Sequence, residues 1–459
     1  MPLKAPSRLI LLIVTALISA IPRVWVFSRH LPWINADSFT YLNLARVLRG
    51  EKVPSGYDPA ALAPYDDQGA RLPGYPLFLN LAFALNGWKG TDPQVLRKIT
   101  LERKPTPIEL SPYHAKYLTR KENLRAVQFL QHLCGILATV FAFDLLFLWT
   151  RSTIFACSGA ILAVGLRPTW ILTYERDILT ETVAATLVLV FLWVVARMQM
   201  TKQKHWLLSA SIVGSALALV RPNYAFAVPL LTVFQLMQKD FKERNHFTTV
   251  LILSLPYFLL VGGWVTRNGL KYGVWNLTTW TGVVSYHFQS HPEVFEDPIL
   301  KREINPKDCR TIAHAIGRLM ENWNVSFPEA NRRLVKETKS AIIRYPEIFL
   351  KSFSEAIVVH WLSFIRVSPK WRHLRIAFFL ALLVITVAGI LATLRKDAPP
   401  EFKFSLTFII VNSLISSLAI DKYDQNRIAF PMESLLTLQA IWLIWKYCKQ
   451  LTNRCNSLK

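Results

Sequence analysis

The stretch "RLILLIVTALISAIPRVWVF" (residues 8–27) and the segment "INADSFTYLNLARVLRG" (34–50) together indicate the fold class. The first is apolar over about 20 residues, the length at which a helix crosses a bilayer. The second places a carboxylate, Asp37, directly beyond that helix. An acidic side chain at a lipid boundary is costly and is retained where it has a use. The two segments therefore predict a membrane protein with a functional site beside its first span.

The composition supports this class. The chain has 459 residues, of which 52% are hydrophobic and only 18% are charged, below the roughly 25% charged residues of soluble domains. The net charge of +23 indicates loops that face lipid head groups, lipid phosphates or the cytoplasm. No aromatic-and-basic module suggests nucleic acid as a partner. The five cysteines form no CxxC pair or His/Cys cluster, which argues against a structural zinc site or a disulfide framework.

Hydropathy predicts about ten membrane spans. The window 206–238 is interrupted by "RPN" and has basic residues on both flanks, so it is interpreted as two short helices that turn back at Arg221-Pro222. Lys4 and Arg8 precede the first window, which is interpreted as an uncleaved signal anchor. The long apolar windows are 8–28, 124–149, 152–173, 178–198, 206–238, 247–266, 375–394, 403–420 and 429–447.

The short loops rich in Lys and Arg predict the orientation. Placing them in the cytoplasm leaves both termini inside and two long polar stretches outside. The fold class is then an all-α polytopic membrane protein with interfacial helices, one of them "SEAIVVHWLSFI" (354–365), which is too short to span. The predicted segments are a first transmembrane helix (1–28), an extracytoplasmic loop with interfacial helices (29–123), a transmembrane bundle (124–266), a second extracytoplasmic region (267–374), and C-terminal spans with a basic cytoplasmic tail (375–459).

Every predicted outer turn carries an ionisable residue. The turns after Asp37 are "RLPGYPLFLNL" (71–81), "YERDILTET" (174–182), "LVRPNY" (219–224), "GGWVTRNGLKYG" (262–273) and "DKYDQNRIAFP" (421–431). This pattern predicts a shared cavity at the outer leaflet in which acids and arginines converge. The alternative is that the arginines are ordinary membrane anchors that reach lipid phosphates. An acid gains little from such phosphates, which favours function for Asp37.

In their order, these motifs resemble the GT-C class of membrane glycosyltransferases, closest in style to protein O-mannosyltransferases and lipid A aminoarabinose transferases. The matching motifs are "DSFTYLNLA", "RLPGYPLFLNL", "ILTETVAATLVLVFLW", "GSALALVRPNYAF", "WVTRNGLKYG" and "NRIAFPMESLL". They cover about 30–290 and 375–447. Two departures stand out: the terminal arginine–tyrosine pair reads "QNRIAF", so that the aromatic ring is missing or is replaced by Tyr423, and the stretch 89–123 is longer than expected.

The resemblance implies transfer of a sugar from a polyprenyl-phosphate donor to an extracytoplasmic acceptor, with inversion at the anomeric carbon. A hydroxyl acceptor needs a base, and Asp37 is the candidate. Phosphate is already a good leaving group, so charge stabilisation matters most, and arginine supplies a bidentate fork for it. Arg71 and Arg267 are the first candidates for the donor phosphate, and Arg221 and Arg427 are the second.

Glu181 is the second catalytic candidate. Its expected role is to hold the sugar or the acceptor, or to bind a divalent ion together with Asp37. Two carboxylates are too few to specify a metal, so the metal question stays open. Asp177 and Glu181 are four residues apart and share a helix face. The substrate-binding candidates are Tyr41, Tyr75, Asp177, Asn268 and Tyr423.

Rival functions are a secondary transporter, a lipid-linked sugar flippase and a non-catalytic assembly subunit. A transporter predicts internal repeats with broken helices near mid-membrane, and no repeat is evident. A flippase or assembly subunit would keep the arginines and tolerate loss of Asp37. The expected partners are the lipid-linked sugar, the acceptor and membrane lipids, with the site on the outer side of a bacterial inner membrane. The identity of the sugar and of the acceptor is not encoded in these patterns.

Overall fold

The computed structural model describes residues 5–30, 32, 36–51, 57–58, 63–64, 68–87, 121–238, 246–280, 287–288, 290–304, 312–362, 399–419 and 425–457. Within this part of the chain the structure is helical apart from one two-residue antiparallel ladder, which confirms the all-α prediction. The elements that precede the bundle are α1 (Ala5–Arg29), α2 (Ala36–Leu48), β1 (Tyr57–Asp58), β2 (Ala63–Pro64) and α3 (Gly74–Leu85).

The bundle and the regions after it follow in chain order. The bundle elements are α6 (Lys121–Thr150), α7 (Thr153–Ala160), η1 (Ile161–Gly165), η2 (Thr169–Tyr174), α8 (Glu181–Thr201), α9 (Lys204–Val220), η3 (Pro222–Tyr224), α10 (Ala227–Leu236), α11 (His246–Tyr257), η5 (Phe258–Gly262) and α12 (Gly263–Tyr272). The later elements are η7 (Pro292–Val294), α13 (Pro298–Glu303), α14 (Ile312–Trp323), α15 (Phe327–Arg344), α16 (Pro346–Leu362), α18 (Pro400–Ala419) and α19 (Gln425–Ser457).

Five described helices are long and apolar enough to cross a membrane: Arg8–Arg29, Leu124–Thr150, Glu181–Thr201, His246–Tyr272 and Pro400–Leu418. The predicted total of about ten spans stays a prediction. The window 375–394 lies outside the described residues, and the window 152–173 forms α7 followed by two π-helical segments, with a break before Thr169. The division of the chain into five segments likewise stays a prediction.

The window 206–238 folds as the sequence predicts, into two helices with a break between them. Arg221 has extended backbone (φ −143°, ψ 127°) and ends α9, and a short 3-10 turn leads into α10. The cause is local: the proline ring disfavours helical backbone at the residue before it, and proline has no N–H to continue the helix. The break therefore places Arg221 at the end of α9.

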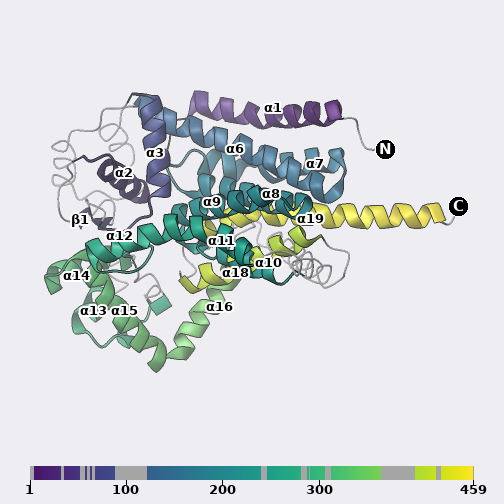
Figure 1. Cartoon of the computed structure of the whole chain (residues 1–459). Coiled ribbons are helices and arrows are strands. Elements are labelled where there is room, and N and C mark those ends of the chain that lie inside the picture. The colour runs from purple at the N-terminus through teal and green to yellow at the C-terminus, as the bar shows by residue number, and fades with distance from the viewer. Residues whose placement is uncertain are drawn as a thin grey trace, which may run out of the picture.

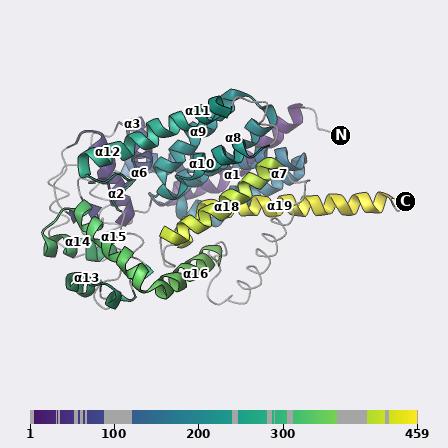
Figure 2. The same ribbon diagram turned by 60° about the horizontal axis from the view of Figure 1, so that its bottom comes forward.

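Both termini lie at the same end of the bundle, and α2, α3, α12 and α14 gather at the opposite end (Figure 1). The second view shows α13, α14 and α15 at that opposite end as well (Figure 2). Helix α8 packs against both α6 and α9 in the centre. The threading with both long polar regions on one side stays a prediction.

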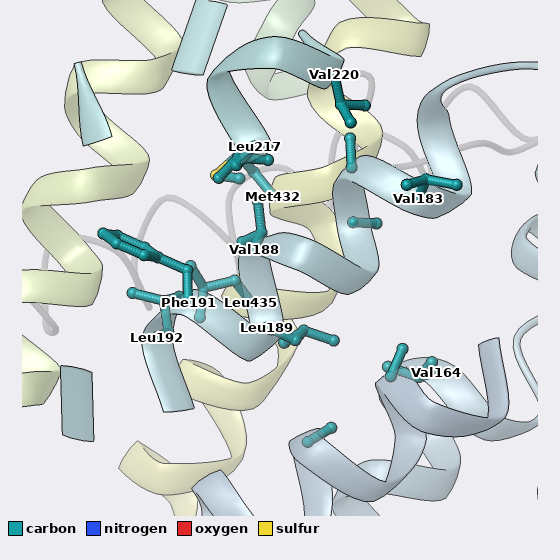
Figure 3. Close-up of a cluster of buried hydrophobic side chains, with 14 of the residues drawn as sticks. Val164, Val183, Val188, Leu189, Phe191, Leu192, Leu217, Val220, Met432 and Leu435 are labelled. Carbon is teal, nitrogen blue, oxygen red and sulfur yellow. The ribbon is translucent and has the colours of Figure 1, made fainter. Parts of the chain in front are cut away.

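The bundle core forms where α8 meets α9 and α19. Phe191 of α8 packs near Leu217 of α9 and Leu435 of α19, and all three are fully buried (Figure 3). By contrast α1 is only 22% buried over its most apolar window, with an exposed apolar face that includes Leu17 and Ile21. In lipid, tight van der Waals packing rather than apolar burial holds helices together, so such an outer face is expected of a peripheral span.

We expect cysteine labelling to confirm the orientation. In a chain without its native cysteines, Lys301→Cys should react with a membrane-impermeant maleimide added to intact cells, and Lys202→Cys should react only after permeabilisation, because the Lys/Arg bias places α13 outside and the α8–α9 loop inside. Lys301 and Lys202 are both exposed on the surface of the protein. Labelling of Lys202→Cys in intact cells would contradict the threading.

Candidate functional site

An ion pair between Asp37 and Arg71 lies at the end of the molecule opposite the termini. Asp37 is in the first turn of α2, where the helix dipole favours a negative charge. Arg71 precedes α3 and donates from Nη2 to Asp37 Oδ1 at 2.6 Å and from Nε to Thr40 Oγ1 at 2.8 Å. The Asp37 side chain remains 27% exposed and the Arg71 side chain 20% exposed. The predicted base and the first predicted phosphate ligand are thus direct neighbours.

Two aromatic rings hold the Arg71 guanidinium. Its carbon lies 5.1 Å from the ring centroid of Tyr41 and 5.1 Å from that of Trp280. Such cation–π contacts add to the hydrogen bonds and restrict the rotamers of a long side chain. Arg71 is therefore pre-organised, and Tyr41 contributes to the site through this contact.

The segment that carries Arg71 is fixed to the chain beyond α12. The Thr279 amide donates to the Gly69 carbonyl at 2.9 Å, and Thr278 Oγ1 donates to the Ala70 carbonyl at 2.7 Å. Gly69 has φ +77°, and a Cβ there would lie 2.7 Å from Thr279 Cγ2 and 3.1 Å from Asn268 Oδ1. Only glycine suits both this backbone conformation and this close approach.

Arg267 belongs to the same neighbourhood. Its Nη1 donates to Asn268 Oδ1 at 2.9 Å, and its guanidinium stacks 4.2 Å from the ring centroid of Trp264. Asn268 is buried and donates to the carbonyls of Asn276 and Leu277, both at 3.0 Å. The predicted pair Arg267 and Asn268 therefore lies against the Gly69–Arg71 segment, although Asn268 acts here as a structural bridge.

A second ion pair lies between the start of α8 and the break after α9. Arg221 Nη2 is 3.7 Å from Glu181 Oε1, and the two side chains are 11% and 0% exposed. The two pairs are connected through α3, because a Cβ at Gly74 would lie 2.8 Å from the Leu219 backbone. The start of α3, three residues after Arg71, therefore touches α9 two residues before Arg221.

The turn between η2 and α8 lies beside Asp37. Ser38 Oγ donates to the Ile178 carbonyl at 2.9 Å, so residues adjacent in sequence to Asp37 and to Asp177 are in contact. Asp177 is partly exposed in this turn. Three close contacts, at Ser38, Gly69 and Gly74, thus bring most of the predicted site residues together.

The remaining candidates have other environments. Tyr75 is fully buried, and its hydroxyl donates to Gln131 Oε1 at 2.6 Å, which favours an indirect role over substrate contact. Tyr423 lies outside the described residues. Arg427 is in the first turn of α19, but its side chain is outside the described part. The assignment of roles to these residues stays a prediction.

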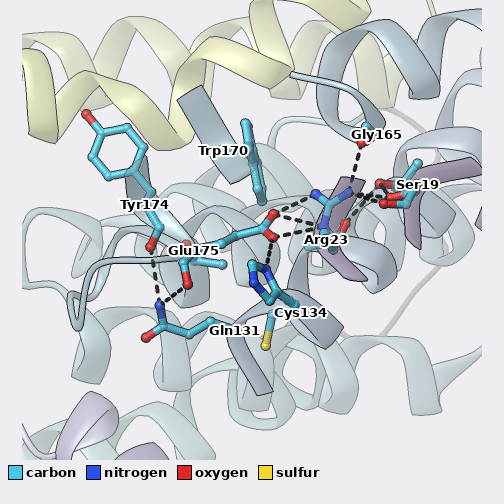
Figure 4. A network of polar contacts seen from close by, with 12 residues as sticks. Ser19, Arg23, Gln131, Cys134, Gly165, Trp170, Tyr174 and Glu175 are labelled. Atoms are coloured by element: carbon cyan, nitrogen blue, oxygen red, sulfur yellow. Dashed lines mark hydrogen bonds and ion pairs between the residues drawn. The ribbon is translucent and has the colours of Figure 1, made fainter. Parts of the chain in front are cut away.

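The structure adds a buried network that the sequence patterns missed (Figure 4). Arg23 of α1 donates from Nε and Nη2 to Glu175 at 2.9 and 2.5 Å, and His132 Nδ1 lies 2.7 Å from Glu175 Oε2. Arg23 and Glu175 are 1% and 0% exposed. Arg23 itself was the signal that could have indicated this network. It is a charged residue inside an apolar span, and such residues pair with partners inside the bundle.

The described residues do not fit a divalent metal ion. They bring together no group of three or more His, Cys, Asp or Glu side chains with the spacing that a metal needs. The carboxylates of Asp37 and Glu181 instead face guanidinium groups. A hard cation requires several oxygen ligands, and an arginine beside each carboxylate opposes a second positive charge.

No family model matches the sequence, and no curated protein matches it. Among solved structures, the chain is similar to the oligosaccharyltransferase of Archaeoglobus fulgidus in complex with zinc and sulfate, with 12% identity and a TM-score of 0.52 over 97% of this chain and 50% of that one. The apo form gives 12% identity and a TM-score of 0.52 over 99% and 52%. The chain has the fold of the GT-C membrane glycosyltransferases.

The chain spans about half the length of that oligosaccharyltransferase. ArnT from Cupriavidus metallidurans bound to undecaprenyl phosphate is also similar, with 12% identity and a TM-score of 0.37 over 96% of this chain and 79% of that one. The similarity to the oligosaccharyltransferase confirms, at the level of the fold, the GT-C resemblance predicted from the ordered motifs.

In this GT-C fold, Gly74→Ala is expected to lower stability by about 1–3 kcal/mol, the usual cost of overpacking. The new Cβ would lie 2.8 Å from the backbone of Leu219, which cannot rotate away. Gly263→Ala is the matched control, because a Cβ there meets nothing within 4 Å and alanine favours the helix. Thermal unfolding in detergent would measure both. Equal midpoints for the two variants would contradict the close α3–α9 packing.

Proposed function

We propose that this chain is a membrane glycosyltransferase that moves a sugar from a polyprenyl-phosphate donor to an extracytoplasmic acceptor with inversion. The observation that carries the proposal is the contact between Asp37 and Arg71, at the end of a GT-C fold where α2, α3, α12 and α14 gather. One group can accept a proton while the other binds an anion. A bacterial inner membrane, with the site on its outer side, is the proposed location.

In the proposed reaction, the acceptor hydroxyl attacks the anomeric carbon of the donor sugar. The new bond joins the acceptor oxygen to that carbon, and the bond from the carbon to the phosphate oxygen breaks with its electron pair moving onto the phosphate. Asp37 takes the hydroxyl proton. A base must be ionised to do so, and a guanidinium neighbour stabilises that form. Polyprenyl phosphate leaves without a general acid, in contrast to the two-carboxylate glycosidases.

Arg71 and Arg267 are proposed to bind the donor phosphate and to stabilise the charge that develops on it. Arginine suits this role because its planar fork can donate two parallel hydrogen bonds to a phosphate. The aromatic contacts of both arginines fix these forks before the donor arrives, so that little reorganisation accompanies the reaction. Arg221 and Arg427 are proposed as secondary phosphate ligands.

Glu181 is proposed to orient the sugar or the acceptor. Its burial and its partner Arg221 hold the carboxylate in one place, which is a requirement for precise positioning. Substrate contacts are proposed for Tyr41 and Asp177. The oligosaccharyltransferase that shares the fold was solved with zinc, but the described residues of this chain do not gather a ligand set, and no step is assigned to a metal.

Transfer from purified polyprenyl-phosphate sugars, followed by mass spectrometry of glycolipids and glycoproteins, tests the proposal. We expect glycosylated product and free polyprenyl phosphate in equal amounts. Movement of the lipid-linked sugar across the bilayer without any product would favour the flippase, and neither outcome in the presence of all donors would favour an assembly subunit.

A further inference from the structure

Gln131 of α6 joins α3 to the turn between η2 and α8. The side chain is fully buried, and its Oε1 accepts the hydroxyl of Tyr75 at 2.6 Å. Its Nε2 donates to the carbonyl of Asp177 at 2.7 Å, to that of Glu175 at 3.0 Å and to that of Tyr174 at 3.3 Å. Figure 4 shows two of these contacts converging on one amide nitrogen. One side chain therefore contacts three carbonyls of a single turn.

The turn interrupts the helical hydrogen bonding, and one of its three carbonyls, that of Asp177, also accepts the Leu179 amide at 2.9 Å. A π-helical segment ends at Tyr174, and α8 begins at Glu181. A buried carbonyl without a partner costs about 1–3 kcal/mol. The Gln131 amide adds a donor that is shared among these carbonyls, and its three contacts favour one conformation of the turn. Two other contacts act on the same segment: Glu175 is buried against Arg23, and Ser38 bonds the Ile178 carbonyl.

The turn bears directly on the site. Asp177 is in it, Glu181 follows it, and Ser38 connects it to the helix turn that carries Asp37. On its other side, Gln131 is bonded to Tyr75, four residues after Arg71. A displacement of the Gln131 amide would therefore shift acids and arginines that lie on three different elements.

We propose that Gln131 is a positioning residue of the transfer site: its amide holds the turn between η2 and α8 and helix α3 in the relative placement that transfer requires. The inference rests on the proposed function. Gln131 acts through the backbone of the turn and through Tyr75, without touching the substrates. A shift of about 1 Å in a reacting group can cost about 100-fold in rate, so such a clamp has a measurable effect.

The test compares Gln131→Leu with Gln128→Leu. Gln128 is on the same helix, is 1% exposed, and donates at 3.3 Å to the carbonyl of His30 rather than to the turn. Both variants replace a buried glutamine of α6 by leucine, so general destabilisation affects both. The measurements on the full chain in detergent are hydrogen exchange over residues 170–182, and kcat and donor KM for transfer.

In Gln131→Leu, we expect the amides of Glu175, Asp177 and Leu179 to exchange faster than in Gln128→Leu. We also expect kcat to fall by about 10- to 100-fold with the donor KM within about threefold, because the geometry of the reacting groups changes more than donor binding does. Tyr75→Phe removes one hydrogen bond from the amide and keeps the ring. It should lower kcat in the same direction by a smaller factor.

Equal exchange of the turn in the two leucine variants would overturn the clamp, and equal kcat would overturn its role in positioning. If Gln131→Leu does not fold, Tyr75→Phe decides: an unchanged kcat there contradicts the proposal, and a reduced kcat with the wild-type unfolding midpoint supports it. Absence of transfer by the wild-type chain would contradict the proposed function itself, and the exchange comparison would still show whether Gln131 holds the turn.

Discussion

Asp37→Asn is expected to reduce sugar transfer by about 100-fold or more, the scale of a lost general base. The substitution keeps the size and shape of the side chain, and the amide oxygen can still accept the hydrogen bond from Arg71 Nη2. Folding and donor binding should therefore change little, while the proton of the acceptor hydroxyl has no base to receive it. The measurement is initial transfer rate from a purified polyprenyl-phosphate sugar, run beside a donor-binding assay.

Thr40→Val is the matched control for Asp37→Asn. It removes the hydrogen bonds from Arg71 Nε to Thr40 Oγ1 and from Thr40 Oγ1 to the Asp37 carbonyl, and it leaves the carboxylate in place. A loss of only about two- to tenfold is expected, because the base is retained. If Asp37→Asn transfers at the wild-type rate, the carboxylate is not the base, and Glu181 or a non-catalytic function becomes the better explanation.

Arg71→Ala is expected to weaken donor use by about 10- to 100-fold, which corresponds to a charge-assisted contact of about 1.5–3 kcal/mol. Arg71→Lys should recover only part of this loss, because an ammonium lacks the planar fork and stacks less well between Tyr41 and Trp280. Arg267→Ala should resemble Arg71→Ala. The effect should appear mainly in the donor concentration needed for half-maximal rate.

Arg302→Ala provides the control for these arginine variants. Arg302 is 64% exposed and pairs with Glu303 in α13, so its loss should leave donor use unchanged. Activity within a few-fold of wild type in Arg71→Ala or Arg267→Ala would identify that arginine as a membrane anchor. A loss in Arg302→Ala equal to that in Arg71→Ala would point to a general effect of surface charge.

Local chemistry made several elements predictable. The runs at 8–28, 124–149 and 178–198 correspond to α1, α6 and α8, because apolar length alone requires a helix in a bilayer. The break at Arg221-Pro222 follows from proline geometry. Helices were also expected within 29–123, where the described residues form α2 and α3; Leu44 of α2 is fully buried in the protein.

The sequence by itself therefore determined the helical class, the ordered motifs of the GT-C fold and the candidate acids and arginines at the helix ends. Only the tertiary structure decided the pairs: Asp37 with Arg71, Glu181 with Arg221, and Glu175 with Arg23. Hydropathy fixes where a helix ends, but it does not fix which helix ends meet. That choice depends on packing between elements far apart in sequence, where close contacts such as Gly74 on Leu219 set the distances between charges.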